Sequence, residues 1–213
     1  MIESTADFLV AAQIELREMV RTGVSSIVQR ARHAPAAWHP NGFVVFTLGA
    51  HPLGNLRLHI WPAMHRKLGG AEANVHTHVW DLCSTVLSGT YGERIFHVVG
   101  DTEGEEVHAA EIDYLRDPDV LTAVGTTSLQ SAAVRTFGRG ELHMVPAGIA
   151  HETIIPLDRY ASTLLLTSKA RIERVQVFSR TPLVSGRRPR LAVGEDLRSR
   201  LLDELQARVE EGR

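Results

Sequence analysis

The sequence has little of several features that mark particular protein classes. Cys83 is its single cysteine in 213 residues, so no disulfide can form within the chain, and nothing indicates an oxidising compartment. It contains no apolar run of about 18 residues, the length that predicts a membrane span. The N-terminal segment is acidic and interrupted by charges, unlike a secretion signal. We therefore expect a cytoplasmic protein without a membrane-spanning segment.

The sequence also lacks a strong charge of either sign. The formal net charge is −2, and the basic stretch SGRRPR at 185–190 is short and lies outside any recognisable motif. Binding to a nucleic-acid backbone needs a clustered basic surface, so we do not expect a nucleic-acid partner. The contents of 44% hydrophobic and 23% charged residues are those of an ordinary globular protein.

Helical patterns are confined to the two ends of the chain. Residues 4–32 carry apolar residues at roughly helical spacing, Ser4 and Asp7 resemble a capping box, and Gly23 is expected to divide the segment into two helices. From Gly194 onward an apolar residue recurs every fourth position among charged ones. This pattern predicts a surface helix at 194–211 that packs on the outside of the domain, with a dimer contact as the alternative.

The central part of the chain predicts an all-β fold. Between 43 and 180, short runs rich in β-branched residues alternate with turn residues, which is typical of an antiparallel sandwich or barrel. We therefore predict a single domain over 1–213, with a helical N-terminal extension at 1–42, a β core at 43–180 and the C-terminal helix.

The segment NVHTHVWDLCSTVL (74–87) carries the first candidate site. If it forms one strand, His76 and His78 share a face with Trp80 and Leu82, because alternate side chains of a strand point the same way. Asp81 then points to the opposite face, as does Cys83. Two imidazoles on one face can reach one metal ion, and imidazole suits iron, zinc, copper or nickel.

A second candidate segment is GRGELHMVPAGIAHETII (138–155). A strand is expected from Glu141 to Val145, followed by a Pro-Ala-Gly turn, and His151 opens the next strand. We expect the turn to return this strand beside the first and so to deliver His151 to the site. His143 lies before the turn, and its pattern fits a site residue or a surface residue.

These two segments resemble the paired motifs of the cupin superfamily. The first motif reads G-x5-H-x-H-x3-E-x6-G and the second G-x5-P-x-G-x2-H-x3-N. The matching residues are Gly70, His76, His78 and Gly89, then Gly140, Pro146, Gly148 and His151. Leu82 replaces the glutamate and Ile155 the asparagine. The resemblance covers about 43–180 and implies a double-stranded β-helix, the jelly-roll barrel of cupins, with the terminal helices outside it.

The resemblance also implies a metal site. His76, His78 and His151 would be the ligands, because Leu82 cannot bind a metal. Cupins with three histidines are similar to thiol dioxygenases and other dioxygenases that use ferrous iron. We therefore expect Fe(II), with zinc, nickel or manganese as alternatives, and a dioxygenase acting on a small organic molecule. A metal-dependent isomerase or hydrolase and a non-enzymatic small-molecule-binding cupin are the alternatives, and a homodimer is compatible with the resemblance.

The segment LRLHIW (56–61) is the candidate substrate-binding strand. Arg57 and His59 lie on one face and the leucines on the other. If this strand neighbours the histidine strand and its polar face lines the barrel, Arg57 can hold a substrate carboxylate; alternatively, both polar residues face solvent. Trp80, in phase with the histidines, would form a pocket wall or a packing contact. Glu93 is either a partner of a metal ligand or a surface charge.

Overall fold

The computed structural model describes residues 4–66, 75–99, 104–113, 119–188 and 190–211. Its helices are α1 (Thr5–Thr22), α2 (Val24–Arg32) and α3 (Glu195–Glu211). Its strands are β1 (Ala36–Trp38), β2 (Val44–His51), β3 (Gly54–Trp61), β4 (Val75–His76), β5 (Trp80–Gly89), β6 (Tyr91–Val99), β7 (Glu105–Asp113), β8 (Asp119–Ser131), β9 (Arg135–Phe137), β10 (Leu142–Val145), β11 (Ala150–Ile154), β12 (Ala161–Ala170), β13 (Val175–Ser179) and β14 (Gly186–Arg188).

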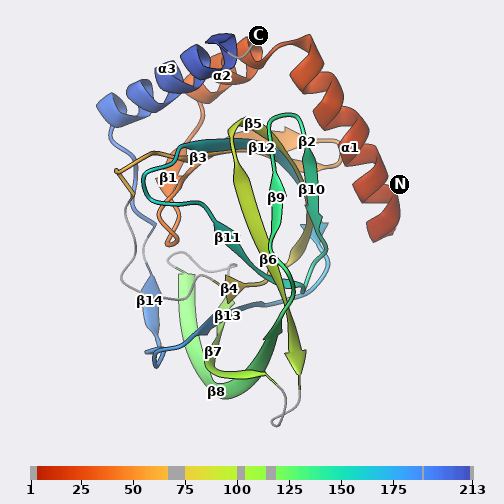
Figure 1. Cartoon of the computed structure of the whole chain (residues 1–213), viewed down its shortest axis with the longest axis vertical. Helices are drawn as coiled ribbons and strands as arrows, with labels where there is room; N and C mark the ends of the chain where they lie inside the picture. Colours follow the sequence, from red (N-terminus) through yellow and green to blue (C-terminus); the bar gives the residue numbers. More distant parts are fainter. Residues whose placement is uncertain (1–3, 67–74, 100–103, 114–118, 189, 212–213) are drawn as a thin grey trace.

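The strands form two sheets in which every described pairing between strands is antiparallel (Figure 1). The order of the six-stranded sheet is β1-β2-β3-β12-β5-β10, and that of the eight-stranded sheet is β14-β8-β7-β13-β4-β11-β6-β9. The predicted all-β core with helices at both ends is therefore confirmed. Among the described residues, no helix combines the length and the apolar character needed to cross a membrane.

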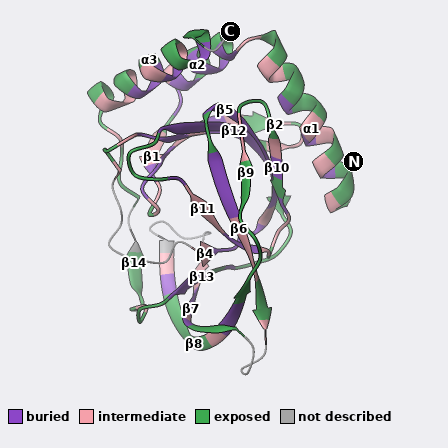
Figure 2. Ribbon diagram, in the orientation of Figure 1, coloured by how far each residue is buried: buried purple, intermediate pink, exposed green. Residues whose placement is uncertain are grey.

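The three helices lie together over the six-stranded sheet (Figure 1). Leu58 of β3, Cys83 of β5 and Leu164 of β12 are fully buried in one cluster with side chains of all three helices. Nearly all residues of β5 and β12 are buried, since one face of these strands meets the helices and the other faces the barrel interior (Figure 2). The helices thus shield the outer face of the strands that carry much of the site.

The helix boundaries follow from their capping residues. The Ser4 hydroxyl accepts a hydrogen bond from the Asp7 N–H at 3.1 Å, which caps α1 as predicted. Gly23 has φ +127°, a conformation that residues with a Cβ rarely adopt, and it separates α1 from α2. The C-terminal helix buries Leu201, Leu205 and a few neighbours against the sheet side, also as predicted.

The boundaries of the β core are wider than the range 43–180. Strand β1 lies within 1–42 and pairs with β2 in the six-stranded sheet, and β14 lies beyond 180 and pairs with β8. Of the motif glycines, Gly70 lies outside the described residues. Gly89 has φ +78°, and a Cβ there would stand 2.1 Å from the Tyr160 carbonyl oxygen, so only glycine fits this turn.

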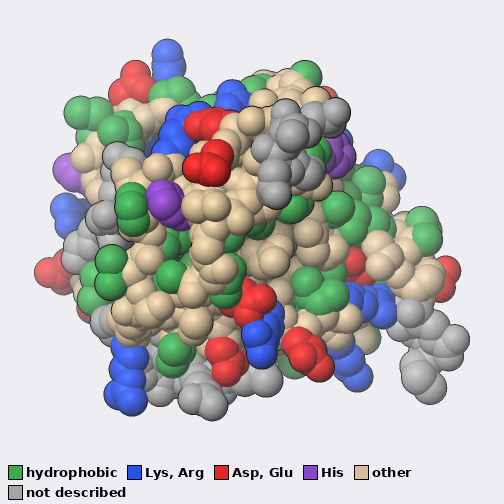
Figure 3. All heavy atoms as spheres, turned by 90° about the horizontal axis from the view of Figure 1, so that it is seen from below, with side chains coloured by type: hydrophobic (Ala, Val, Ile, Leu, Met, Phe, Trp, Pro, Cys, Tyr) green, Lys and Arg blue, Asp and Glu red, His purple; other side chains and the backbone are tan. Residues whose placement is uncertain are grey.

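Acidic and basic side chains are interspersed on the face of the molecule seen from below (Figure 3). Among the described residues drawn there, neither sign forms a continuous patch. This distribution agrees with the small net charge of the sequence.

Candidate metal centre

Three histidines converge inside the barrel. His76 on β4 and His151 on β11 are directly opposite each other in an antiparallel pair, so the sheet register brings their rings together. The two ring centroids are 4.8 Å apart, and His78 lies 4.8 Å from His76 and 5.0 Å from His151. One ring nitrogen from each histidine lies within 4.8 Å of the others.

The sequence pattern suggested one strand for the segment that carries His76 and His78. The structure instead divides this segment between two strands. β4 ends at His76 in the eight-stranded sheet, and β5 begins at Trp80 in the six-stranded sheet. The chain crosses between the sheets at 77–79, yet His76, His78, Trp80 and Leu82 all line the same cavity. The alternation of side chains therefore continues through the crossing, although the strand does not.

Backbone hydrogen bonds fix the crossing segment. The His78 carbonyl accepts a hydrogen bond from the Gly148 N–H at 2.9 Å, and the Val79 carbonyl accepts one from the Arg171 N–H at 2.5 Å. The Thr77 N–H donates to the Gln176 carbonyl at 2.9 Å. The backbone around His78 is thus fixed by hydrogen bonds, although it lies outside the strands.

The second motif also differs from the expected hairpin. β10 pairs with β5 in one sheet, whereas β11 pairs with β4 and β6 in the other. The Pro-Ala-Gly turn therefore leads from one sheet to the other and does not return β11 beside β10. His151 still arrives at the site, because β11 lies next to the short strand that bears His76.

One pair of ring nitrogens has the spacing of two ligands of a single divalent transition metal ion. The Nε2 atoms of His78 and His151 are 3.0 Å apart. Two imidazole nitrogens that each bind one ion at about 2.0–2.1 Å are separated by about 2.8–3.4 Å at coordination angles between octahedral and tetrahedral. Burial lowers the pKa of His78 well below its ordinary value, and the neighbouring His76 and His151 lower it further. His78 is consequently neutral at pH 7, the form that binds metals.

Glu93 on β6 orients His151 from behind. Its buried carboxylate lies 3.2 Å from His151 Nδ1 and 2.8 Å from the Arg135 guanidinium. Burial alone would raise the pKa of Glu93, but the hydrogen bond with His151 and the charge of Arg135 contribute to lowering it overall. An ionised carboxylate accepts the Nδ1–H of His151, which leaves the Nε2 lone pair for a metal. Glu93 is therefore the hydrogen-bond partner of a candidate metal ligand.

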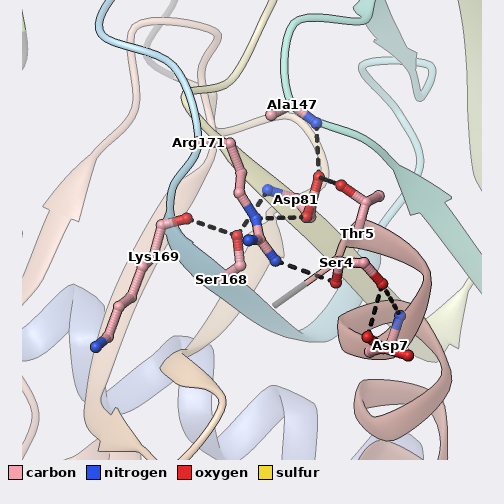
Figure 4. Close-up of polar contacts among 8 residues, drawn as sticks. All are labelled: Ser4, Thr5, Asp7, Asp81, Ala147, Ser168, Lys169 and Arg171. Atoms are coloured by element: carbon pink, nitrogen blue, oxygen red, sulfur yellow. Dashed lines mark hydrogen bonds and ion pairs between the residues drawn. The ribbon is translucent and has the colours of Figure 1, made fainter. Parts of the chain in front are cut away.

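Asp81 points away from the cavity, as strand phase predicted. Its carboxylate accepts hydrogen bonds from the Thr5 hydroxyl at 3.2 Å and the Ala147 N–H at 3.0 Å, and it pairs with Arg171 at 3.1 Å (Figure 4). The Arg171 guanidinium also donates to the Ser4 carbonyl at 3.2 Å. This buried carboxylate thus joins the start of α1 to the turn that leads to His151.

The histidines border a cavity of about 210 Å³. Its volume is below the range of about 300–1,000 Å³ typical of sites for drug-sized molecules, so it suits a small ligand. No Asp or Glu is present among the described residues that line it, which are Ala37, Trp38, His39, Pro40, Asn41, Phe43, Val45, Thr47, Arg57, His59, Trp61, His76, His78, Trp80, Leu82, Ser84, Tyr91, Ile112, Leu121, His143, His151, Thr153, Thr163, Leu165, Thr167, Val177, Leu183 and Arg190.

Arg57 and His59 of β3 face this cavity, and the leucines of the same strand face the helices. β3 does not neighbour the histidine strand, an arrangement that the sequence left open, because β12 lies between β3 and β5, and β2 lies on the other side. The Arg57 guanidinium still stacks over the Trp80 ring at 4.6 Å, and Trp80 in turn stacks on His78 at 5.9 Å. Burial lowers the pKa of His59 well below its usual value, with Arg57 as the next cause.

Leu82 faces the cavity and packs with Val145 and Leu165. It occupies the position of the carboxylate ligand in the cupin motif. Cys83 points to the helix side and is fully buried there, and burial raises the pKa of its thiol to about 12. Neither residue can supply a fourth ligand.

His39 belongs to no motif in the sequence, yet it lines the cavity. Its ring stacks on Phe43 at 4.3 Å and lies 5.8 Å from His76. In the sequence His39 lies in an apparent loop, which gives no sign of a place in the site. In the structure this loop joins the paired strands β1 and β2. His143 also lines the cavity, stacked on Tyr91 at 4.2 Å, and burial is the main cause that lowers its pKa to about 4.

No protein-family model and no curated protein sequence matches this chain. A hydroquinone 1,2-dioxygenase crystallised with Cd²⁺ and 4-hydroxybenzonitrile aligns with a TM-score of 0.34 and 16% identity, over 59% of this chain and 63% of its own. The hydroquinone 1,2-dioxygenase of Sphingomonas sp. TTNP3 with bound 4-hydroxybenzoate aligns at 0.33 and 14%, over 59% and 65%. This chain thus spans less than two thirds of the length of either dioxygenase chain.

A cupin-like protein from Thermotoga maritima aligns with a TM-score of 0.30 and 10% identity, over 79% of this chain and 94% of its own. The chain itself combines two antiparallel sheets, paired motifs in cupin order and three histidines from those motifs at one cavity. These features agree with the cupin-type barrel that the two motifs predict.

Proposed function

We propose that this chain is a metal-dependent cupin enzyme, a mononuclear non-haem iron dioxygenase that oxidises a small organic molecule. The observation that carries the proposal is the convergence of three imidazoles, two buried and that of His78 half-buried, on the wall of one cavity. A metal held by His76, His78 and His151 would face space that a substrate can fill. A purely structural metal needs no such space, since structural sites are usually closed by protein ligands.

Ferrous iron bound here would supply open coordination positions for dioxygen and substrate. Glu93 would keep the proton of His151 on Nδ1 and so hold the ring in its ligating orientation. Arg57 would bind an anionic group of the substrate by charge-assisted hydrogen bonds. Trp80 and His59 would form walls that exclude water and orient a flat substrate.

A zinc-, nickel- or manganese-dependent isomerase or hydrolase is the second candidate. Such chemistry uses a general acid or base whose pKa lies near the working pH. The described lining contains no carboxylate. Its His143 has a pKa of about 4, and burial raises the pKa of Tyr91 above its ordinary value. These groups are poorly matched to pH 7, and the dioxygenase proposal is therefore preferred. A non-enzymatic binding protein would use the same cavity without turnover.

The test begins with the metal content of the protein purified without added metal. Oxygen uptake is then followed after ferrous loading, with panels of small thiols, diketones and phenols. The His76→Ala/His78→Ala double variant is the matched control and is expected to lose both metal and uptake. Zinc retention without uptake on any substrate would favour the second candidate or the binding protein. Equal metal content in wild type and double variant would contradict the metal site itself.

A further inference from the structure

A row of five side chains crosses the inner face of the six-stranded sheet. Register places His143 opposite Ser84, Ser84 opposite Leu165, Leu165 opposite Arg57, and Arg57 opposite Thr47. All five line the cavity. His76 and His151 come from the eight-stranded sheet, so a molecule lying on this row would face the candidate metal centre.

Two polar atoms of this row lack partners within the described part of the chain. The Ser84 hydroxyl and His143 Nδ1 are both buried and have no hydrogen bond. The two residues are 1% and 4% exposed. Buried polar groups in native proteins almost always have a hydrogen-bond partner. Two neighbouring groups without one, both facing the same cavity, therefore point to a ligand that provides the missing hydrogen bonds.

Packing fixes the direction of the His143 ring. It lies flat against Tyr91, with 4.2 Å between centroids and 17° between planes, and Phe137 contacts it at 5.3 Å. Tyr91 is itself held by a hydrogen bond of 3.0 Å between its hydroxyl and that of Thr153. The polar atoms at this end of the row are therefore pre-organised, which reduces the entropy lost when a ligand binds.

A positive charge lies near the other end of the row, one position before Thr47. Arg57 is two strands away from Ser84, about 10 Å at the usual strand spacing. The side chain between them is Leu165, which is apolar and 1% exposed. The cavity is also lined by the aromatic rings of Phe43, Trp61 and Trp80. The row thus presents a cation, an apolar middle and a neutral hydrogen-bonding pair, in that order.

From this arrangement we infer that Ser84 and His143 bind the hydroxyl group of a flat substrate whose opposite end is a carboxylate. The substrate class is a small hydroxylated aromatic acid. The hydroxyl donates to one of the two atoms and accepts from the other, while Arg57 holds the carboxylate and Leu165 contacts the ring. This inference rests on the proposed function, because it names the substrate class of the same cavity.

The test compares 4-hydroxybenzoate with benzoate, which lacks the hydroxyl, by calorimetric titration of the protein as purified and after loading with redox-inert zinc. We expect the wild type to prefer 4-hydroxybenzoate. Ser84→Ala and His143→Phe should each weaken its binding by about 2- to 12-fold, the worth of one neutral hydrogen bond of about 0.5–1.5 kcal/mol, and leave benzoate unchanged. Phenylalanine preserves the stacking on Tyr91. Arg57→Met should weaken both probes.

Ser162→Ala is the matched control, because Ser162 is a fully buried serine of β12 that is not among the cavity-lining residues. It should leave both affinities unchanged. Equal affinity of the wild type for the two probes, binding of neither, or an unchanged preference in both site variants would overturn the inference. If the preference for 4-hydroxybenzoate depends on Ser84 but no oxygen is taken up, only the dioxygenase proposal is refuted. If oxygen is taken up but the variants keep the wild-type preference, only this inference is refuted.

Discussion

Glu93 provides the sharpest test of the metal centre, because it is fully buried and contacts only one of the three histidines in the described structure. Partners of this kind typically contribute 10- to 100-fold to metal affinity. Glu93→Gln keeps the volume and one oxygen for His151 Nδ1 but removes the charge and turns an amide toward Arg135. We expect it to weaken metal binding by about 10-fold, or about 1.4 kcal/mol. Glu93→Ala removes the acceptor and should approach 100-fold.

The assay is competition between the protein and a chromophoric chelator for zinc and for cobalt, a spectroscopic substitute for ferrous iron. Thermal unfolding of the metal-free proteins separates a loss of affinity from a loss of folding. Glu105→Gln is the matched control, since its carboxylate forms an exposed ion pair with Arg180 far from the cavity lining. If both Glu93 variants bind zinc within two-fold of the wild type, Glu93 does not orient His151 and the assigned tautomer is wrong.

Three further predictions concern stability and reactivity. Asp81→Asn removes the charge that faces Arg171, and we expect urea unfolding to show a loss of about 2 kcal/mol; an unchanged midpoint would contradict the role of this carboxylate. His143 has a folded pKa of about 4 against an ordinary value of 6.5, so the unfolded chain takes up the proton first as the pH falls. Because of His143, the free energy of unfolding of the wild type should fall by about 1 kcal/mol between pH 7 and 5.5. Urea unfolding at the two pH values should show that this decrease is absent from the His143→Phe variant. The Cys83 thiol, with a pKa of about 12, should react with a disulfide reagent only after unfolding, and rapid reaction of the native protein would refute its burial.

The period of the strands made much of the site predictable from the sequence. Alternation alone assigned His76, His78, Trp80 and Leu82 to one face and Asp81 to the other, and the cavity lining and the Asp81 contacts agree. The assignment survived even though the strand breaks at 77–79. Side-chain direction depends on local backbone conformation, and the side chains on both sides of the crossing still line one cavity.

Strand pairing was not predictable, because it depends on contacts between distant segments. The local pattern of LRLHIW identifies a strand with one polar face but contains nothing that places β12 beside it. For the same reason Glu93 and His143 could not be assigned: each follows or precedes a turn in sequence, and only the register of β6 with β11 and of β10 with β5 brings them to the site. When a charge or a hydrogen-bond partner comes from a strand distant in sequence, the residues around it in the sequence do not reveal its role.

Leu82 determines the charge that the candidate centre presents. It replaces the carboxylate of the cupin motif, and its contacts with Val145 and Leu165 leave no polar group in that position. Imidazole ligands are neutral when they bind a metal, and the carboxylate of Glu93 lies behind His151 rather than in the cavity lining. A divalent ion would therefore keep its full positive charge toward the cavity, where Arg57 adds another and the described lining offers no carboxylate. Both charges attract an anionic substrate, and an acidic ligand at position 82 would weaken that attraction.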